Sequence, residues 1–477
     1  MKKNKKKWIK FACLFTVFTF SQSLCGCGEK AEDVVTLRVS NWEEYIDEGE
    51  WEEEDAVELD NGTYICPQNS MIQDFEEWYE ETYGTKIKVE YSTFGTNEEL
   101  YNQLSMGDVY DLVCPSEYMI MKMIKEDMVV PFSEQFYNKE KKENYYVKGV
   151  SPYISGVYDS LSIDGEALSK YAAGYMWGTL GIVYNPEYIS EEEASHWDLL
   201  LQDKYKKRVT LKDSVRDAYF AGNSVLNREK ICSEEFLGQK DYKSQLESLL
   251  NATDQNTINQ VEEILSRMKE NVYSFETDSG KADMVTGKVV ANQQWSGDAV
   301  YTLDQAEEDG VVLCYSAPEE ATNLWFDGWC MLKEGIQEDE EKQKVAEAFI
   351  NYLSRPDNAI RNMEYIGYTS VISGGENDSI LQYVNYNYAT EEEEGVPYPI
   401  GYFFTGQSEQ ELSPEVSEYY TIMTSKDQLN RQLFSQYPTE EVMERSVVMA
   451  YFDKEGNERI NQMWLNIRCF DLYGFFQ

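Results

Sequence analysis

The chain has 477 residues, with 87 Asp and Glu against 42 Lys and Arg, and its formal net charge is −45. A chain of this length exceeds one average domain, so we expect two lobes. So acidic a balance excludes nucleic acid and anionic lipid surfaces as favoured partners, because phosphate binding requires a basic surface.

The first 26 residues have the pattern of an export signal. Lysines between Lys2 and Lys10 precede an apolar run, residues 11–20, that is too short to cross a bilayer. Residues 24–27 read Leu-Cys-Gly-Cys and resemble a bacterial lipobox, which predicts Cys27 as the lipidated N-terminus of the mature protein. Residues 27–34 are then a tether, and we expect membrane contact through the lipid anchor only.

The body of the chain alternates predicted strands and helices. Strands are expected over residues 35–39, 86–91, 110–114 and 182–184, the last of them preceded by the segment 176–179. Helices are expected between the cap Ser70 and Gly84, and over residues 340–353. This alternation predicts an α/β fold, in which ligands bind beyond the carboxyl ends of strands.

Two stretches depart from this compact plan. Residues 47–67 are rich in acids and separate the first strand from its helix by more than a normal loop. Residues 375–435 carry several tyrosines and a glutamate run. Both stretches are interpreted as surface insertions.

Few residues favour metal binding or catalysis. The cysteines outside the signal and the lipid site are Cys66, Cys114, Cys232, Cys314, Cys330 and Cys469. They lack close Cys-x-x-Cys spacing, so we expect no metal site or cofactor, while their disulfide state stays open. His196 is the only histidine and is interpreted as structural, which leaves little basis for a Ser-His-Asp arrangement.

Aromatic residues stand beside carboxylates at two separated places. Residues 41–45 read Asn-Trp-Glu-Glu-Tyr, and residues 324–327 read Leu-Trp-Phe-Asp. Aromatic faces attract an organic cation and carboxylates neutralise it, so this pairing indicates cation binding. Glu43 and Glu44 are adjacent and would point to opposite faces of an extended chain, so alone they cannot form the facing acids of a glycosidase.

A longer series of motifs resembles a known family. The motifs are Asn41-Trp42-x-Glu44-Tyr45, Tyr110-Asp111-Leu112-Val113-x-Pro115-Ser116-x-Tyr118, Trp177-Gly178-Thr179, Asp213-x-x-Arg216-Asp217, Trp295-x-Gly297, Trp325-x-Asp327, and Arg355-Pro356-Asp357 followed by Ile366-Gly367-Tyr368. In this order they resemble the periplasmic spermidine/putrescine-binding proteins, the substrate-binding components of polyamine ABC transporters. The resemblance covers residues 35 to about 374 and a segment around 441–467.

The resemblance implies a two-lobed periplasmic binding protein of type II-like fold, with the ligand cleft between the lobes. Its first lobe would combine residues 35–177 with 327–376, and its second lobe residues 178–326 with 377–477. The chain would cross between the lobes near Gly178, near residues 325–327 and after Gly374. Such crossings would act as the hinge on which the lobes close.

The resemblance also implies the residues of the binding site. The ligand-binding residues carried over are Trp42, Glu44, Tyr45, Ser116, Tyr118, Asp217, Trp295, Trp325, Asp327 and Tyr368. Ser214 stands where better-studied members place a second acid, and Glu43 stands where a hydroxyl is common. Asp298, which follows Trp295 closely, is our own candidate for a replacement carboxylate.

These expectations define a polyamine-binding lipoprotein, not an enzyme. It would be a monomer that passes spermidine or putrescine to ABC permease subunits served by a cytoplasmic ATPase. The alternatives are a binding lipoprotein for a sugar or an amino-acid-like cation, a sensor that does not transport, and a secreted glycoside hydrolase. The choice between spermidine and putrescine stays open at this point.

Overall fold

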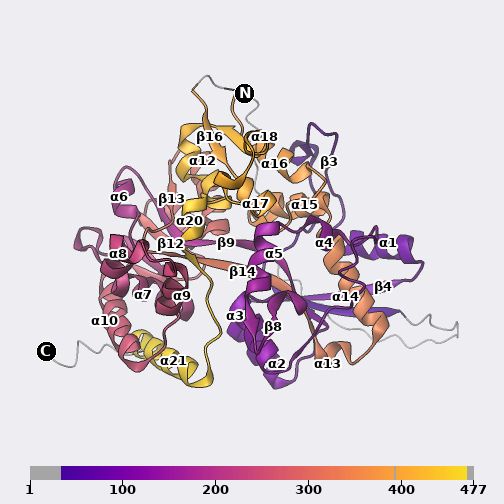
Figure 1. Cartoon of the computed structure of the whole chain (residues 1–477), viewed down its shortest axis with the longest axis horizontal. Helices are drawn as coiled ribbons and strands as arrows, with labels where there is room; N and C mark the ends of the chain where they lie inside the picture. Colours follow the sequence, from indigo (N-terminus) through magenta and orange to yellow (C-terminus); the bar gives the residue numbers. More distant parts are fainter. Residues whose placement is uncertain (1–33, 392–393, 470–477) are drawn as a thin grey trace.

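The computed structural model describes residues 34–391 and 394–469. The predicted export signal, Cys27 and all but the last residue of the tether lie outside the described residues. In Figure 1, helices α7 (Val215–Ile231), α9 (Tyr242–Leu250), α10 (Gln255–Asn271) and α21 (Lys454–Cys469) gather on one side of the molecule. Helices α1 (Met71–Tyr83), α2 (Asn97–Met106), α3 (Glu117–Lys125) and α14 (Glu340–Leu353) lie on the other side. These two sides are the two lobes of an α/β fold.

One sheet runs through both lobes. Its main path, in spatial order, is β11 (Ser274–Glu276), β10 (Val209–Lys212), β12 (Ala291–Trp295), β9 (Ala172–Tyr184), β14 (Thr322–Leu332), β5 (Leu112–Val113), β1 (Val35–Trp42) and β4 (Ile87–Phe94). Four short strands flank β9 and β14, namely β13 (Cys314–Ser316), β15 (Thr369–Ser370), β18 (Ser446–Val447) and β6 (Val129–Val130). We call the part built on β1, β4 and β5 the first lobe, and the part built on β10, β11 and β12 the second lobe.

The long strands β9 and β14 connect the two lobes. They pair antiparallel from Leu324 opposite Thr179 to Cys330 opposite Ala172, with a register shift after Asp327. Residues 180–184 of β9 also pair with β12 of the second lobe, whereas residues 330–331 of β14 pair with β5 of the first. Both strands are therefore shared between the lobes.

Strand β9 is longer than the sequence pattern indicated. Residues 176–179 lie inside this 13-residue strand and do not precede it. Every residue of β9 is buried, so no polar alternation marks its beginning. The third expected strand, over residues 110–114, is shorter than predicted and pairs only through Leu112 and Val113.

The two predicted helices are confirmed. In α1 the Ser70 hydroxyl accepts a hydrogen bond from the Gln73 amide, and Gly84 ends the helix in a left-handed conformation with φ of 73°. Helix α1 buries Phe75 and Tyr79 against the sheet. Helix α14 spans residues 340–353, as its apolar spacing indicated.

Shorter elements connect these parts. The remaining helices are α4 (Tyr145–Gly149), α5 (Pro152–Ser160), α6 (Glu191–Ala194), α8 (Glu234–Leu237), α11 (Gly280–Val285), α12 (Ser296–Glu308), α13 (Lys333–Ile336), α15 (Pro356–Ile366), α16 (Ser379–Tyr388), α17 (Gly401–Thr405), α18 (Pro414–Tyr419), α19 (Gln432–Gln436) and α20 (Glu440–Glu444). The remaining strands form three two-stranded antiparallel sheets: β2 (Val57–Glu58) with β3 (Tyr64–Ile65), β7 (Ser162–Ile163) with β8 (Glu166–Ala167), and β16 (Val396–Pro399) with β17 (Thr421–Thr424).

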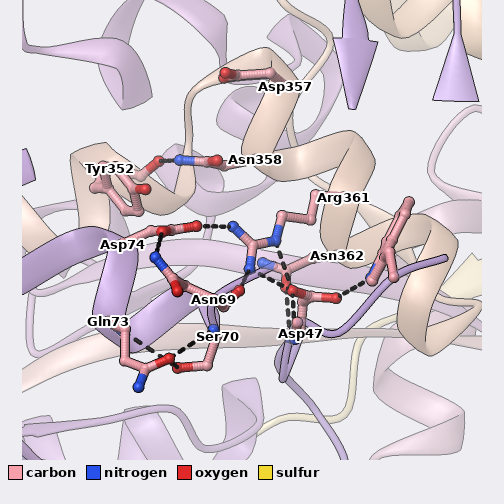
Figure 2. A network of polar contacts seen from close by, with 12 residues as sticks. Asp47, Asn69, Ser70, Gln73, Asp74, Tyr352, Asp357, Asn358, Arg361 and Asn362 are labelled. Atoms are coloured by element: carbon pink, nitrogen blue, oxygen red, sulfur yellow. Dashed lines mark hydrogen bonds and ion pairs between the residues drawn. The ribbon is translucent and has the colours of Figure 1, made fainter. Parts of the chain in front are cut away.

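Residues 47–67 are tied to the first lobe by a buried polar network (Figure 2). The Arg361 guanidinium donates to Asp47 at 2.6 Å and to Asp74 at 2.6 Å, and it also reaches the Asn69 carbonyl. Burial raises the pKa of Asp47, and the charge of Arg361 opposes that shift. Because Trp51 in the same segment is also buried, this stretch packs into the core and does not lie wholly on the surface.

Residues 375–435 also carry side chains into a core. Tyr383, Tyr398 and Phe403 are almost fully buried, and they belong to the same apolar cluster as Ile154 of α5 and Ile360 of α15. The helices α16 and α17 therefore pack against elements that the predicted boundaries assign to the first lobe, although residues 377–477 were expected in the second. Their tyrosines supply the apolar surface that makes this packing favourable.

The described residues include six cysteines, all of them free thiols, with Cys114 and Cys330 buried. His196 lies 3.2 Å from a carboxylate oxygen of buried Glu320 on the second lobe, away from the cleft described below. No helix among residues 34–391 and 394–469 is both long and apolar enough to span a bilayer.

Candidate ligand-binding cleft

A cleft of about 2270 Å³ opens between the lobes beside β9 and β14. All thirteen residues predicted for the site line it: Trp42, Glu43, Glu44, Tyr45, Ser116, Tyr118, Ser214, Asp217, Trp295, Asp298, Trp325, Asp327 and Tyr368. They come from the end of β1, the start of α3, the β10–α7 and β12–α12 junctions, strand β14 and the residue before β15. The fold thus brings together residues that are widely separated along the chain.

Asp327 is a buried residue that lines this cleft. The Tyr45 hydroxyl donates to Oδ2 of Asp327 at 2.8 Å, and the Ser116 hydroxyl donates to Oδ1 at 2.8 Å. The strand bulge after Asp327 changes the register of β14 at this point, and bulges commonly redirect side chains at binding sites. Within the described residues Asp327 forms no ion pair, so both of its hydrogen bonds come from neutral groups.

This environment disfavours the charged form of the Asp327 carboxyl. Burial raises the pKa of Asp327 to about 6, although hydrogen bonds from Ser116 and Tyr45 favour the carboxylate. A ligand cation placed beside this group would supply the missing opposite charge.

Aromatic rings surround Asp327. The Tyr45 and Tyr368 rings meet edge to face at 5.1 Å, and the Trp325 ring lies 5.7 Å from that of Tyr368. Two glycines allow this approach, because a Cβ on Gly297 would lie 2.3 Å from the Tyr368 ring and one on Gly178 would lie 2.5 Å from the Trp325 ring. The close approach of these rings therefore explains why the two motifs have glycine at these positions.

Asn97 forms hydrogen bonds with the cleft residues at the start of α3, and it was not anticipated from the sequence. Its side-chain amide donates to the hydroxyls of Ser116 at 3.1 Å and Tyr118 at 3.0 Å, and its carbonyl oxygen accepts from the Ser116 amide. Asn97 is buried at the start of α2. In the sequence, the one available signal was an asparagine at the acidic start of a helix.

Asp298 has a different environment from the one we expected. Its carboxylate lies 3.1 Å from Lys212 Nζ and 3.6 Å from Lys281 Nζ, and it accepts a hydrogen bond from the Tyr368 hydroxyl at 2.9 Å. Burial alone would raise the pKa of Asp298, but the two lysines lower it below its ordinary value. This acid faces the cleft with its charge already neutralised, so it does not replace the missing carboxylate as a free acid.

Protein cations also cover two of the aromatic rings. Lys212 Nζ lies 4.5 Å from the centre of the Trp295 ring, and the Arg216 guanidinium lies 4.4 Å from the centre of the Tyr118 ring. Arg216 also stacks on Phe452 at 3.8 Å. Lys212 had no role in the predicted site, and its position at the end of a buried strand was the one available signal.

The remaining candidates divide between the second lobe and the rim. The Trp295 indole donates to Asp217 at 3.4 Å, and burial raises the pKa of Asp217. The Ser214 hydroxyl caps α7 by accepting from the Asp217 amide at 3.4 Å. Glu43 and Glu44 are exposed, and Glu44 has a positive φ of 52°, so this pair does not continue the extended strand.

The cleft therefore offers carboxylates, aromatic walls and few reactive groups. Within the described residues, no cluster of His, Cys, Asp or Glu side chains is arranged to hold a metal ion. A site of this composition suits non-covalent capture of a small cationic solute.

Two lobes joined by shared strands around such a cleft define an extracytoplasmic solute-binding protein. The family model "Bacterial extracellular solute-binding protein" matches residues 70–382. The chain belongs to this family.

Several relatives have names that specify a ligand. The chain is 27% identical over 347 residues to the spermidine/putrescine-binding periplasmic protein of Salmonella typhimurium, covering 71% of this chain and 78% of the relative. It is 24% identical over 379 residues to the putrescine-binding periplasmic protein PotF of Escherichia coli, covering 76% and 84%. Its fold matches that of the substrate-binding protein PotD of Streptococcus pneumoniae with a TM-score of 0.56 at 24% identity, over 91% of this chain and 98% of the other.

Proposed function

We propose that this protein binds a polyamine, spermidine or putrescine, in the cleft and delivers it to the permease of an ABC transporter. The observation that carries this proposal is Asp327, a buried acid among aromatic rings that has no ion pair within the described residues. A polyamine has cationic ends and an apolar methylene chain, and it would satisfy both the carboxylate and the rings. The names of the relatives support the same ligand class.

Anchoring and delivery complete the proposal. The lipobox-like sequence at residues 24–27 supports a lipid anchor on Cys27, which would hold the protein at the outer face of the cytoplasmic membrane. Closure of the lobes about β9 and β14 would enclose the ligand before transfer. The names of the relatives are those of binding proteins and give no support to a hydrolase.

Calorimetry on the mature protein tests ligand binding. We expect saturable heat with spermidine or putrescine, and we expect Asp327→Asn to weaken that binding about tenfold or more because the buried opposite charge is lost. Asp283→Asn is the matched control, since Asp283 pairs with Lys288 and does not line the cleft. No heat with either amine, together with binding of a sugar or an anion, would exclude the proposal.

One rival ligand class has a specific observation in its favour. The Arg216 guanidinium lines the cleft and forms no ion pair within the described residues, so it could meet a ligand carboxylate. An amino-acid-like cation would use both Arg216 and Asp327. A thermal-shift screen that compares amines with basic amino acids separates the two ligand classes. Only a ligand with a carboxylate would use Arg216, so basic amino acids should stabilise the protein more than amines do if this rival class is the true one.

A further inference from the structure

Lys212 is a buried lysine at the end of β10, and it is one of the residues that line the cleft. Its Nζ donates to the Thr277 carbonyl at 2.7 Å and to Asp298 Oδ2 at 3.1 Å, and it lies 3.8 Å from Glu276. The Trp295 ring lies beside the same ammonium group. Two carboxylates, a carbonyl oxygen and an aromatic face therefore surround one primary ammonium.

This set of partners is the one that an amine ligand would need. An ammonium group leaving water requires acceptors for its N–H bonds and an opposite charge, and an indole face adds further attraction. On the second-lobe wall the protein meets these requirements with its own side chain. The space beside Trp295 and Asp298 is thus an ammonium site that Lys212 already fills.

The other partners of Asp298 leave no room for a second ammonium there. Lys281 contacts Oδ1 of Asp298 and also pairs with Asp278 at 2.6 Å, and the Tyr368 hydroxyl donates to the same Oδ1 of Asp298. A ligand amine at this place would face Lys212 and Lys281 with like charge in a buried setting, where such repulsion is weakly screened.

Four buried carboxyls line the cleft within the described residues: Glu117, Asp217, Asp298 and Asp327. Asp298 already pairs with Lys212 and Lys281. Glu117 accepts a hydrogen bond from the Phe326 amide at 3.0 Å, and burial raises its pKa to about 8, so it keeps its proton at neutral pH. Glu117, Asp217 and Asp327 form no ion pair in the described part of the chain, and with Glu117 protonated, Asp217 and Asp327 remain to match two ligand ammonium groups.

We propose that Lys212 is a specificity-determining residue that occupies the place of a ligand ammonium and restricts the cleft to diamines, with exclusion of triamines. This inference rests on the proposed polyamine function. It predicts a putrescine-type ligand whose two ammonium groups meet Asp217 and Asp327. The third ammonium of spermidine would have to compete with Lys212 for the same acids.

The experiment is calorimetry with putrescine and spermidine on the mature wild-type protein, on Lys212→Met and on Lys288→Met. Methionine keeps an unbranched side chain, one heavy atom shorter than that of lysine, and removes the charge. Lys288 is the matched control because it is an exposed lysine of the same lobe, paired with Asp283 and outside the cleft. Circular dichroism establishes that each variant is folded.

We expect the wild-type protein to bind putrescine at least tenfold more tightly than spermidine. In Lys212→Met that ratio should fall by tenfold or more through a gain in spermidine affinity, whereas Lys288→Met should keep the wild-type ratio. An unchanged ratio in folded Lys212→Met, or a wild-type preference for spermidine, would overturn the inference, and the second result needs no variant. Absence of binding by both amines to the wild-type protein would instead contradict the proposed function itself.

Discussion

Asp327 and Asp298 both line the cleft and are similarly buried, with 6% and 7% of their surfaces exposed. Asp327 has only neutral hydrogen-bond donors, whereas Asp298 has two lysines. Burial raises the pKa of the first, and the lysines lower the pKa of the second. The comparison teaches that burial alone does not identify a ligand-binding acid, because the presence of a protein cation decides whether the charge is available.

The largest expected difference between the two acids is in stability without ligand. Asp298→Asn leaves Lys212 and Lys281 without their shared acid, and removing one partner from a buried ion pair costs about 3 kcal/mol or more. Asp327→Asn removes a desolvated charge that has no protein cation, so we expect a change of under about 1 kcal/mol. Urea unfolding of the two variants and the wild-type protein measures both free energies.

Equal losses of stability in the two variants would contradict this comparison. Asp357→Asn is a suitable control, because Asp357 pairs with Arg355 at the partly exposed start of α15. Its loss should stay within the small range of a surface ion pair.

The next largest effect is a pH dependence of binding that belongs to Asp327. With a pKa of about 6 in the folded protein, Asp327 takes up a proton between pH 7 and pH 5, and the affinity for an ammonium ligand should fall about tenfold over that range. Calorimetry at several pH values on the wild-type protein and on Asp327→Asn measures this, because the variant should lose the dependence.

The stability of the ligand-free protein should change in the opposite sense. The folded-state pKa of Asp327 lies above the ordinary value of 3.8, so the folded state binds more protons than the unfolded state between these values. The contribution of this group to the free energy of unfolding therefore falls as the pH rises from about 4 to 6. Asp298, with a lowered pKa, contributes with the opposite sign.

The binding experiment has its own contradicting outcome. If the affinity of the wild-type protein depends on pH as little as that of Asp327→Asn, the pH dependence does not belong to Asp327.

One side of this comparison was much easier to predict from the sequence than the other. The acid and aromatic residues around Asp327 lie in short motifs, so their types and spacing alone indicated cation binding. The partners of Asp298 could not be found in this way, because Lys212 is 86 residues distant and reaches it only through the pairing of β10 with β12. The sign of the charge available at a site depends on such long-range contacts.

The same distinction applies to the fold. Helix α1 was predictable because its cap, apolar spacing and terminal glycine are all local. Strand β9 was not delimited correctly, because burial on both faces removes the alternation that marks a strand. Residues 375–435 carry polar and acidic runs, so the segment was interpreted as a surface insertion although its buried tyrosines pack against α5 and α15.

The smallest expected effect concerns the hydroxyl that Tyr45 donates to Asp327 at 2.8 Å. Tyr45→Phe removes a hydrogen bond that favours the carboxylate, so the pKa of Asp327 should rise further above its ordinary value. It also frees Oδ2 for the ligand, and the two changes offset each other, so we expect only about threefold weaker binding at pH 7.

The informative quantity is therefore the midpoint of the pH dependence of binding, which should move upward in Tyr45→Phe. Tyr137→Phe is the control, because its hydroxyl donates to the Ser169 carbonyl outside the cleft, and it should leave the midpoint in place. An unchanged midpoint in Tyr45→Phe would mean that burial alone determines the ionisation of Asp327, and the neutral donors would then lose their part in the contrast with Asp298.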